Sequence, residues 1–378
     1  MKTRFRIRLE ILALGLLSAS LAQGATYYVA SVSTTDLGNL GGPEASALDI
    51  NNRGVIVGYS KNPAMTRRAF RWQGGVMTDI GTPTSSARSI ASGINDYDEI
   101  VGQYGDPDEF NWQAFYWSAG TGVITLNRSL YPGQPFDSSY VAIARAINNK
   151  GVIVGTVEAA GLDHDVPVLP CFRALPVVWG SAYSKPKILH CPEGTDGVNS
   201  GSDINDSNWI TGYELPFSGA DNGFVWKSGT TTHAVAPIFG SHPRAFGINE
   251  SGVVVGTADL FGTTREAFRW NGAGTSQWLG VLSGGSTSEA AEVNDQGFVT
   301  GTSDAFVEGG GPSAVKDRAY LWHADFGMFA LPVPAGMTPV STSCDGSSLN
   351  NLKTTGLIQV VGHCGTRAIR WNVLVLSH

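Results

Sequence analysis

The chain has 378 residues, with 25 Lys or Arg against 32 Asp or Glu, which gives a formal net charge of −7. This balance excludes a nucleic-acid partner, because phosphate recognition needs a basic stripe that the sequence does not carry. Gly supplies 48 residues, about 13% against a usual value near 7%, and charged residues make up only 15%. With no long amphipathic helical pattern, this composition predicts short strands joined by tight turns.

The N-terminus has the pattern of a secretory signal peptide. Four basic residues fall within the first eight positions, residues 11–21 form an apolar run, and small residues allow cleavage after Ala22 or Gly24. The apolar run is too short to cross a bilayer, and no later stretch is long enough, so no transmembrane segment is expected. We therefore predict a signal peptide over residues 1–24 and an exported mature chain, periplasmic or extracellular, over residues 25–378. A retained N-terminal anchor is the alternative.

A phrase built on Ile-Asn-x-x-Gly, followed by three apolar residues and Gly, returns seven times, and each copy ends on an apolar pair and Trp. The Asn positions are Asn51, Asn95, Asn148, Asn205, Asn249, Asn294 and Asn350. The Trp positions are Trp72, Trp117, Trp179, Trp226, Trp270, Trp322 and Trp371. Spacings of 44 to 57 residues between successive Asn positions are typical of propeller blades and solenoid units.

The first copy shows what one repeat builds. Residues 45–50, 55–59, 68–73 and 76–80 have strand character, and residues 51–54 form the first turn. Asn suits the first place of a type I turn, where its side chain caps the turn backbone. Gly suits the fourth place, where φ is positive.

The exceptions to this turn pattern support it. Two copies replace the fourth-place Gly by Asp98 and Asn208, the residue types that best tolerate a left-handed backbone. The seventh copy departs further, because Gly356 follows Asn350 only after an insertion. That turn must be rebuilt.

The repeat predicts an all-β, seven-bladed β-propeller with four antiparallel strands per blade. The second strand is apolar at successive positions, so both of its faces are covered. The third strand carries aromatics two apart, such as Phe70 and Trp72, which we expect to pack on the next unit. Residues 27–37 resemble a fourth strand, and we expect them to pair with residues 372–376 and close the ring. An open solenoid or two separate β domains is the alternative.

Three elements of the repeat also match a family. Residues 37–42 have the sequence Leu-Gly-Asn-Leu-Gly-Gly, residues 47–58 carry Ala-x-x-Ile-Asn-x-x-Gly, and residues 69–72 are Ala-Phe-Arg-Trp. These motifs resemble the HAF-type extracellular repeat proteins. The resemblance implies an exported bacterial repeat protein of β-propeller type and brings no established activity. Arg68 replaces the His of the family motif in the first copy, so no role of that His carries over.

Four cysteines in an exported chain predict two disulfides. Three pairings are possible, and the spacing favours Cys171–Cys191 and Cys344–Cys364 because each pair then lies within one repeat. None of the four has a zinc-like spacing, so we expect no metal site built on cysteine.

No catalytic motif occurs, and neither a catalytic residue nor a cofactor is predicted. There is no Gly-x-Ser-x-Gly turn, zinc-binding helix, P-loop or EF-hand loop. The variation lies instead in four long connections that open on one face of a propeller: residues 104–113, 127–140, 158–175 and 303–318. Carboxylates beside aromatics suit sugar binding, and hard oxygens suit calcium, although acidic loops also simply keep a protein soluble. The candidate ligand-binding residues on these loops are Asp106, Asp108, Trp112, Asp163, His164 and Asp165.

Two classes of function follow from this sequence. The first, which we favour, is an exported and monomeric binding or scaffold protein without chemistry of its own. It would recognise a glycan, a peptide or a surface partner through the long-loop face. The alternative is a hydrolase or lyase acting on polysaccharide, with loop carboxylates as acid and base.

Overall fold

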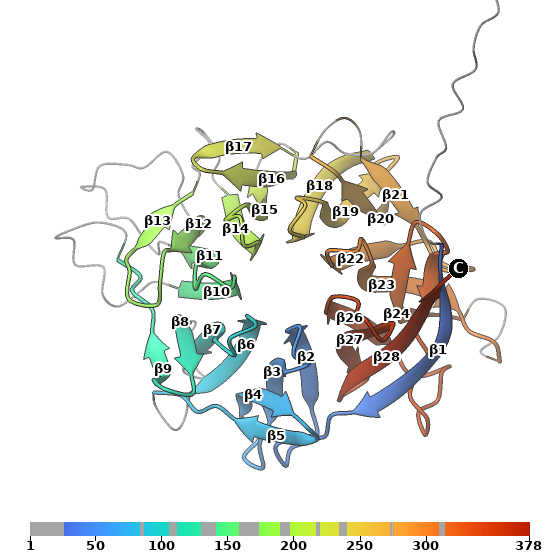
Figure 1. The fold of residues 1–378 in the computed structure, drawn as a ribbon, viewed down its shortest axis with the longest axis horizontal. Coiled ribbons are helices and arrows are strands. Elements are labelled where there is room, and N and C mark those ends of the chain that lie inside the picture. Colours follow the sequence, from blue (N-terminus) through green and yellow to red (C-terminus); the bar gives the residue numbers. More distant parts are fainter. Residues whose placement is uncertain are drawn as a thin grey trace, which may run out of the picture.

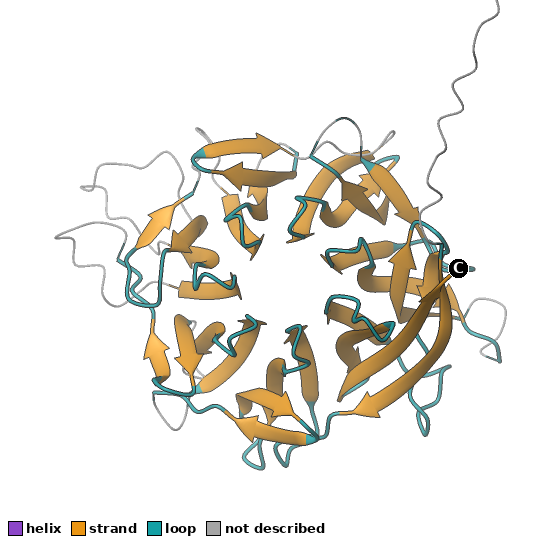
Figure 2. Ribbon diagram, in the orientation of Figure 1, coloured by secondary structure: helices purple, strands orange, loops and turns teal. Residues whose placement is uncertain are grey.

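The computed structural model describes residues 26–83, 87–105, 112–129, 141–158, 174–189, 197–216, 220–233, 240–272, 274, 276–309 and 314–378. In these residues 28 strands and no helix form seven blades around a central axis (Figure 1). Figure 2 shows the same ring, in which the described connections between strands are loops and turns. The predicted all-β, seven-bladed propeller is confirmed. No helix of the described residues is long and apolar enough to cross a membrane.

Each blade has four antiparallel strands, and we number the blades 1 to 7 from the inner strand that opens each one. The inner strands are β2 (Ala45–Ile50), β6 (Arg88–Ile94), β10 (Val141–Ile147), β14 (Gly197–Ile204), β18 (Gly240–Ile248), β22 (Ser288–Val293) and β26 (Cys344–Leu349). The second strands are β3 (Ile56–Lys61), β7 (Ile100–Gly105), β11 (Ile153–Glu158), β15 (Ile210–Pro216), β19 (Val254–Leu260), β23 (Val299–Phe306) and β27 (Leu357–Cys364).

The two outer positions of each blade follow the same order. The third strands are β4 (Arg67–Gln73), β8 (Gln113–Ser118), β12 (Ala174–Trp179), β16 (Asn222–Lys227), β20 (Thr264–Trp270), β24 (Val315–His323) and β28 (Arg367–Ser377). The outermost strands are β5 (Val76–Asp79), β9 (Gly122–Thr125), β13 (Pro186–Ile188), β17 (Thr230–His233), β21 (Gln277–Gly280), β25 (Gly327–Ala330) and, in blade 7, β1 (Tyr27–Asp36). One parallel bridge between Ala174 and Val198 links blades 3 and 4, and the other five blades are separate sheets.

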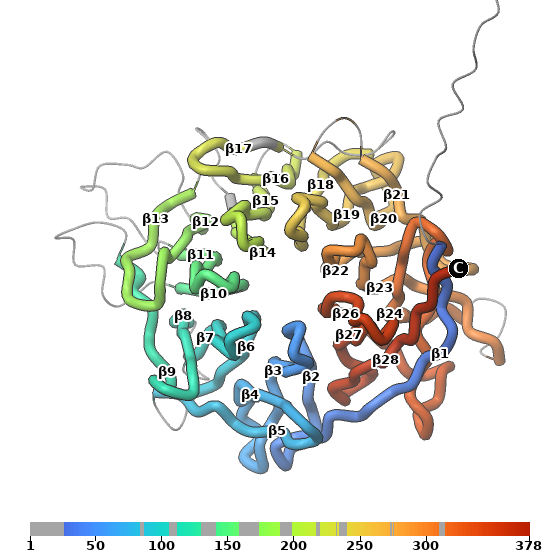
Figure 3. Tube along the Cα trace, viewed as in Figure 1, coloured from blue at the N-terminus to red at the C-terminus, as the bar shows by residue number. Residues whose placement is uncertain are grey.

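The ring is closed by the two ends of the chain. Strand β1 pairs antiparallel with β28, with Val29 opposite Val375 and Thr35 opposite Arg370. Figure 3 shows the N-terminal trace in blue lying along the C-terminal trace in red. The expected pairing of the N-terminal segment with the last blade is confirmed.

The turns after the inner strands have the backbone that the repeat predicts. The fourth turn residue has a positive φ in six copies: Gly54, Asp98, Gly151, Asn208, Gly252 and Gly297. Asp98 and Asn208 adopt φ of 63° and 59°, within the left-handed region that Asp and Asn tolerate. In the rebuilt seventh turn Gly356 has φ of 81°.

The hydrophobic core lies between blades, and one expectation about it is wrong. Phe70 and Trp72 are buried in a cluster with Val361 and Ala368 of blade 7, so they pack on the preceding blade and not on the next one. The opposite face of blade 1, including Val57, packs on blade 2. The alternation of side chains along a strand assigns residues to two faces, but it does not say which face packs on the following blade.

Cys344 and Cys364 lie opposite each other in β26 and β27 and form the predicted disulfide within blade 7. The second predicted pair, Cys171–Cys191, lies outside the described residues. The prediction of a long loop over residues 303–318 is wrong, because β23 and β24 stay paired as far as Phe306 and Val315. Continued strand pairing satisfies backbone groups that a loop would have left to water.

We expect loss of this disulfide to weaken the closing blade. The bond spans a sequence separation of 20, for which the entropic account gives about 3 kcal/mol of stability. Changing both Cys344 and Cys364 to Ala should lower the free energy of unfolding by about that amount in a denaturant titration without reductant. An unchanged midpoint and slope would show that the crosslink contributes nothing to the native state.

Candidate functional site

The seven inner strands share one irregularity that shapes the central channel. Each has a β-bulge at the residue three positions before the repeated Asn. A bulge leaves one residue unpaired and redirects its side chain. All seven bulged residues line the channel: Leu48, Ser92, Arg145, Ser202, Phe246, Ala291 and Ser347. Their chemistry differs from blade to blade, whereas the neighbouring Asn and Trp recur.

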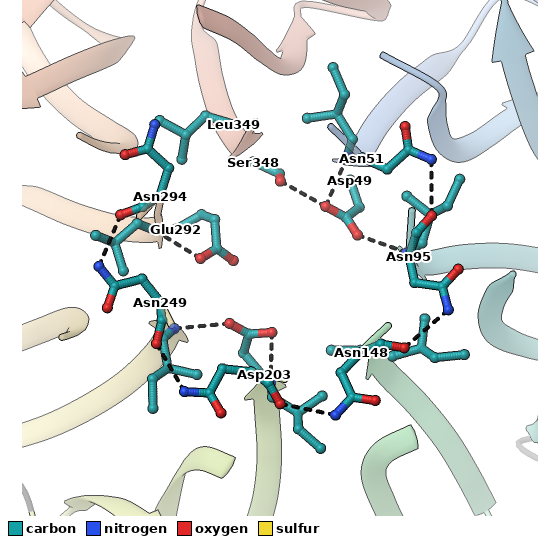
Figure 4. Close-up of a pocket in the computed structure, with 18 of the residues that line it drawn as sticks. Asp49, Asn51, Asn95, Asn148, Asp203, Asn249, Glu292, Asn294, Ser348 and Leu349 are labelled. Carbon is teal, nitrogen blue, oxygen red and sulfur yellow. Dashed lines mark hydrogen bonds between the residues drawn. The ribbon is translucent and has the colours of Figure 1, made fainter. Parts of the chain in front are cut away.

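The repeated Asn uses both ends of its side-chain amide. Asn51 Oδ1 accepts the backbone N–H groups of Arg53 and Val55 in its own turn, at 3.1 and 3.0 Å. Its Nδ2 donates to the backbone carbonyl of Asn95 in the next blade at 2.9 Å. The same link recurs at the five following seams, at 2.9 to 3.1 Å (Figure 4). At the seventh seam, Asn350 donates instead to the side chain of Gln359 at 3.0 Å.

A second ring of hydrogen bonds also links the blades. In each blade a side-chain oxygen of the residue after the Asn accepts the backbone N–H of the equivalent residue in the preceding blade. The ring passes through Asn52, Asp96, Asn149, Asp206, Glu250, Asp295 and Asn351, at 2.7 to 3.0 Å. It returns to its start, because Asn351 donates to Asn52. This ring therefore closes the seam that the Asn amides leave open.

Three carboxylates project from the inner strands into the channel: Asp49, Asp203 and Glu292, each directly after a bulge (Figure 4). Asp49 connects three blades. It accepts the N–H of Ile50 in its own strand and of Ile94 in blade 2, both at 2.8 Å. It also accepts the hydroxyl of Ser348 in blade 7 at 2.7 Å.

The other two carboxylates converge on blade 5. Asp203 accepts the N–H of Ile248 at 2.9 Å and that of Ile204 in its own strand at 2.8 Å. Glu292 accepts the N–H of Val293 at 2.8 Å. Its Oε1 lies 2.8 Å from the point where a Cβ on Gly247 would stand. The missing side chain at position 247 thus makes room for Glu292.

These carboxylates hold their protons more tightly than usual. Burial raises the pKa of Asp49. Burial also raises the pKa of Asp203 to about 7, and the negative charge of Asp49 adds to the effect. Burial and the nearby Asp203 raise the pKa of Glu292 well above its ordinary value. Each carboxylate opens on the channel, but protein surrounds the channel on all sides, so hydration of the charge is incomplete.

The channel forms a cavity of about 520 Å³ with an uneven lining. Seven carboxylates face one guanidinium, that of Arg145. Phe246 and Tyr213 line one wall with their ring centroids 5.9 Å apart, edge to face, and both rings are partly exposed. No group of three or more His, Cys, Asp or Glu side chains among the described residues is placed to hold a metal ion.

Of the predicted site residues, only Trp112 belongs to the described ranges, and it does not line the channel. Trp112 comes directly before β8, and its backbone carbonyl accepts the N–H of Ala142 at 2.8 Å. Ala142 is near the start of β10, whereas Asn148 follows the end of that strand, so Trp112 lies toward the face opposite the Asn turns. The other predicted residues lie outside the described ranges: Asp106, Asp108, Asp163, His164 and Asp165.

The sequence did not lead us to predict the channel residues, although it contains a pattern that indicates them. The place directly before Ile-Asn, or its Val-Asn and Leu-Asn variants, is acidic in three copies, at Asp49, Asp203 and Glu292, and small in the other four. An inner strand beside an apolar core has little reason to carry acids unless that position faces a channel. That signal identifies the position, but the bulge that aims the preceding residue inward is not readable from the sequence.

Comparison with known sequences corrects the family resemblance. Residues 42–167, a third of the chain, match a family described as "Protein of unknown function (DUF3466)". The match is not to the HAF-type extracellular repeat family, so that resemblance is wrong. The motifs that suggested the resemblance combine a turn Asn, a turn Gly, an apolar strand and a buried aromatic. A propeller blade requires these features for its turns and its core, whatever its family. No curated protein matches the chain.

Several solved structures have a similar fold at low sequence identity. Prolyl oligopeptidase B from Galerina marginata has a TM-score of 0.52 at 10% identity, over 88% of this chain and 52% of that one. A prolyl endopeptidase structure gives 0.51 at 9% identity, over 92% and 50%. An oligogalacturonate lyase in complex with manganese gives 0.50 at 11% identity, over 93% and 96%. The chain thus spans about half the length of the two prolyl peptidases, and these identities show the fold alone.

We expect the Asn ring to be a principal source of stability. Asn205→Ala removes the acceptor for the N–H of Trp209 and the donor to the carbonyl of Asn249. One buried and one partly buried backbone group then lack partners, at a cost of about 2–5 kcal/mol in the free energy of unfolding. Denaturant titration should show this loss. The exposed Thr354→Ala variant, on the same face, should change stability by less than about 0.5 kcal/mol, and an equal effect of both variants would refute a special role for the ring.

The raised pKa of Asp203 makes stability depend on pH. Between its ordinary value of 3.8 and about 7 the folded protein keeps a proton that the unfolded chain has released. Stability from this group is therefore fully present below pH 4 and declines as the pH rises toward 7. The melting temperature of Asp203→Asn should fall less steeply than that of the wild type from pH 4.5 to 8. Parallel curves would show that Asp203 titrates normally.

Proposed function

We propose that the chain is an exported binding propeller that performs no chemistry of its own and holds its ligand at the channel. The observation that carries this is the bulge position, where Arg145 and Phe246 stand among small residues and Leu48. The repeated Asn caps a turn and the repeated Trp packs in the core, so both residues have structural roles. The bulge position is the one that the repeat leaves free, and it lines the cavity.

The hydrogen bonds of the channel favour binding over catalysis. Asp49 and Asp203 use both carboxylate oxygens to accept N–H groups from two blades each. A general base must be free to take a proton from a substrate, and a carboxylate held in this way is committed to the seam. The excess of carboxylates also disfavours an acidic ligand within the channel and favours one with a cationic group.

One observation supports the alternative of an enzyme. Glu292 has a pKa raised well above its usual value, and the hydrogen bonds among described residues engage only its Oε1. A carboxyl group kept protonated near neutral pH is suited to act as a general acid. The prolyl peptidases and the lyase of similar fold are too distant in sequence to add weight to this alternative.

The binding proposal predicts which substitutions matter. A glycan and peptide array identifies a ligand, and calorimetry measures its affinity. Phe246→Ala or Arg145→Ala should weaken binding about tenfold, the usual effect of removing a main contact. Ser92→Ala, at the same bulge position in another blade, should change it little, and all three melting temperatures should stay close to that of the wild type.

Two outcomes would contradict parts of this proposal. Binding that is lost in Trp112→Ala, or when Asp163 and Asp165 are both changed to Asn, but not in the channel variants, would place the ligand on the predicted long-loop face. Reproducible turnover of a polysaccharide or peptide that disappears in Glu292→Gln would establish catalysis and reject the non-catalytic role.

A further inference from the structure

A basic pocket lies at the seam between blade 7 and blade 1, outside the central channel. Its volume is about 400 Å³, and three cationic side chains line it: Arg53, Lys353 and Arg370. The described residues around it include no Asp or Glu. The chain has a net charge of −7, and its channel carries seven carboxylates. Three cations around one pocket therefore set this seam apart from the acidic channel.

The charge of Arg370 is poorly matched by its surroundings. Its guanidinium carbon lies 4.9 Å from the ring centroid of Trp72, and its Nη2 donates to the hydroxyl of Thr35 at 3.3 Å. Its Nε is buried and has no hydrogen-bond partner among the described residues. Burial lowers the pKa of Arg370, because the cation loses water without gaining a carboxylate. A buried donor on a charged group is costly to leave unpaired, so the charge of the guanidinium that lines the pocket is only partly satisfied by the protein.

The seam between blades 1 and 2 shows which chemical group would pair with the guanidinium of Arg370. Arg71 holds in blade 1 the place that Arg370 holds in blade 7, directly before the repeated Trp. Its Nη2 lies 2.7 Å from Oδ2 of Asp98, the fourth turn residue of blade 2. At the blade 7–blade 1 seam the same turn place is Gly54, which lines the pocket and has no side chain to offer. An external oxyanion there would complete the ion pair that Asp98 provides at the next seam.

Lys353 adds a second positive charge at this place. It belongs to the insertion that lengthens the seventh turn. Its Nζ lies 4.0 Å from the point where a Cβ on Gly54 would stand and 3.4 Å from Oε1 of Gln359. Among the described residues no carboxylate pairs with it, whereas Arg53 at the rim lies 3.6 Å from Asp98. The insertion thus brings a cation beside Arg370 at this seam, where the repeat itself requires none.

We propose that this pocket binds an oxyanion, a carboxylate, sulfate or phosphate group, between Arg370 and Lys353. The planar fork of Arg370 supplies paired donors that suit such a group, and Lys353 supplies a point charge. The pocket is independent of the ligand proposed for the channel, whose acidic lining repels anions.

Calorimetric titration of the full chain at constant ionic strength tests the site. One arm uses inorganic sulfate and phosphate, and the other uses a free uronic acid, so the two sources of the anion are distinguished. Saturable binding of either with one site per chain is expected. Arg370→Gln should weaken it at least about tenfold and Lys353→Gln about three- to tenfold, as expected for charge-assisted hydrogen bonds.

The chain offers a matched control. Arg269 also precedes a repeated Trp and stacks on the Trp of the next blade, with its guanidinium carbon 5.6 Å from the ring centroid of Trp322. It has no counterpart of Lys353, so Arg269→Gln should leave anion affinity unchanged. Equal losses in Arg269→Gln and Arg370→Gln would show a general charge effect and overturn the site.

A second variant tests the proposal even if Arg370→Gln folds poorly. Gly54→Asp supplies the missing carboxylate, and Asp98 shows that Asp accepts a positive φ at this turn place. The added Cβ would stand 2.9 Å from Oε1 of Gln359, which is the end of a flexible side chain and can shift, so this variant should fold. It should abolish anion binding because its carboxylate pairs with Arg370. The neutral Gly54→Asn should retain binding within about threefold, since it keeps the charge of the pocket unchanged. Anion affinity that survives in Gly54→Asp, or no saturable binding in the wild type, would overturn the proposal.

Discussion

The side-chain amide of the repeated Asn links local and global structure in this propeller. Its carbonyl caps the turn that ends each inner strand, and its Nδ2 donates to the next blade, as from Asn51 to Asn95. In six of the seven copies one residue does both, so the residue that caps the turn also places a donor at the seam. Polar strand residues add to these links, as where Asp49 accepts the N–H of Ile94 in the next blade.

The same arrangement accounts for the acids of the channel. The N–H groups of Ile94 and Ile248 face the axis, and Asp49 and Asp203 accept them from the neighbouring blade. A carboxylate is a strong acceptor, but at the axis it stands among other carboxylates with limited water. The seams are therefore strengthened at an electrostatic cost, which appears as the raised pKa values of Asp49 and Asp203.

Much of the fold could be predicted because the repeat encodes it locally. The Asn–Gly turn, the substitutions Asp98 and Asn208, and the closing strand all follow from backbone preference and strand pattern. The direction in which Phe70 packs could not be predicted. Both faces of its blade are apolar, and each face packs on a neighbouring blade. The channel could not be predicted either, because Asp203 and Glu292 are 89 residues apart in sequence and meet only when the ring closes.

The place where the repeat breaks is also where the molecule loses its sevenfold regularity. The insertion after Asn350 turns the amide of that residue toward Gln359 and leaves the blade 7–blade 1 seam without the Asn link. The second ring of hydrogen bonds, in which Asn351 donates to Asn52, still closes the seam. Strand β1 and the Cys344–Cys364 bond reinforce blade 7. Closure rests on these contacts, and the charges of Lys353 and Arg370 have no carboxylate beside them in the pocket. Their unmatched charges are therefore better explained by a ligand than by the fold.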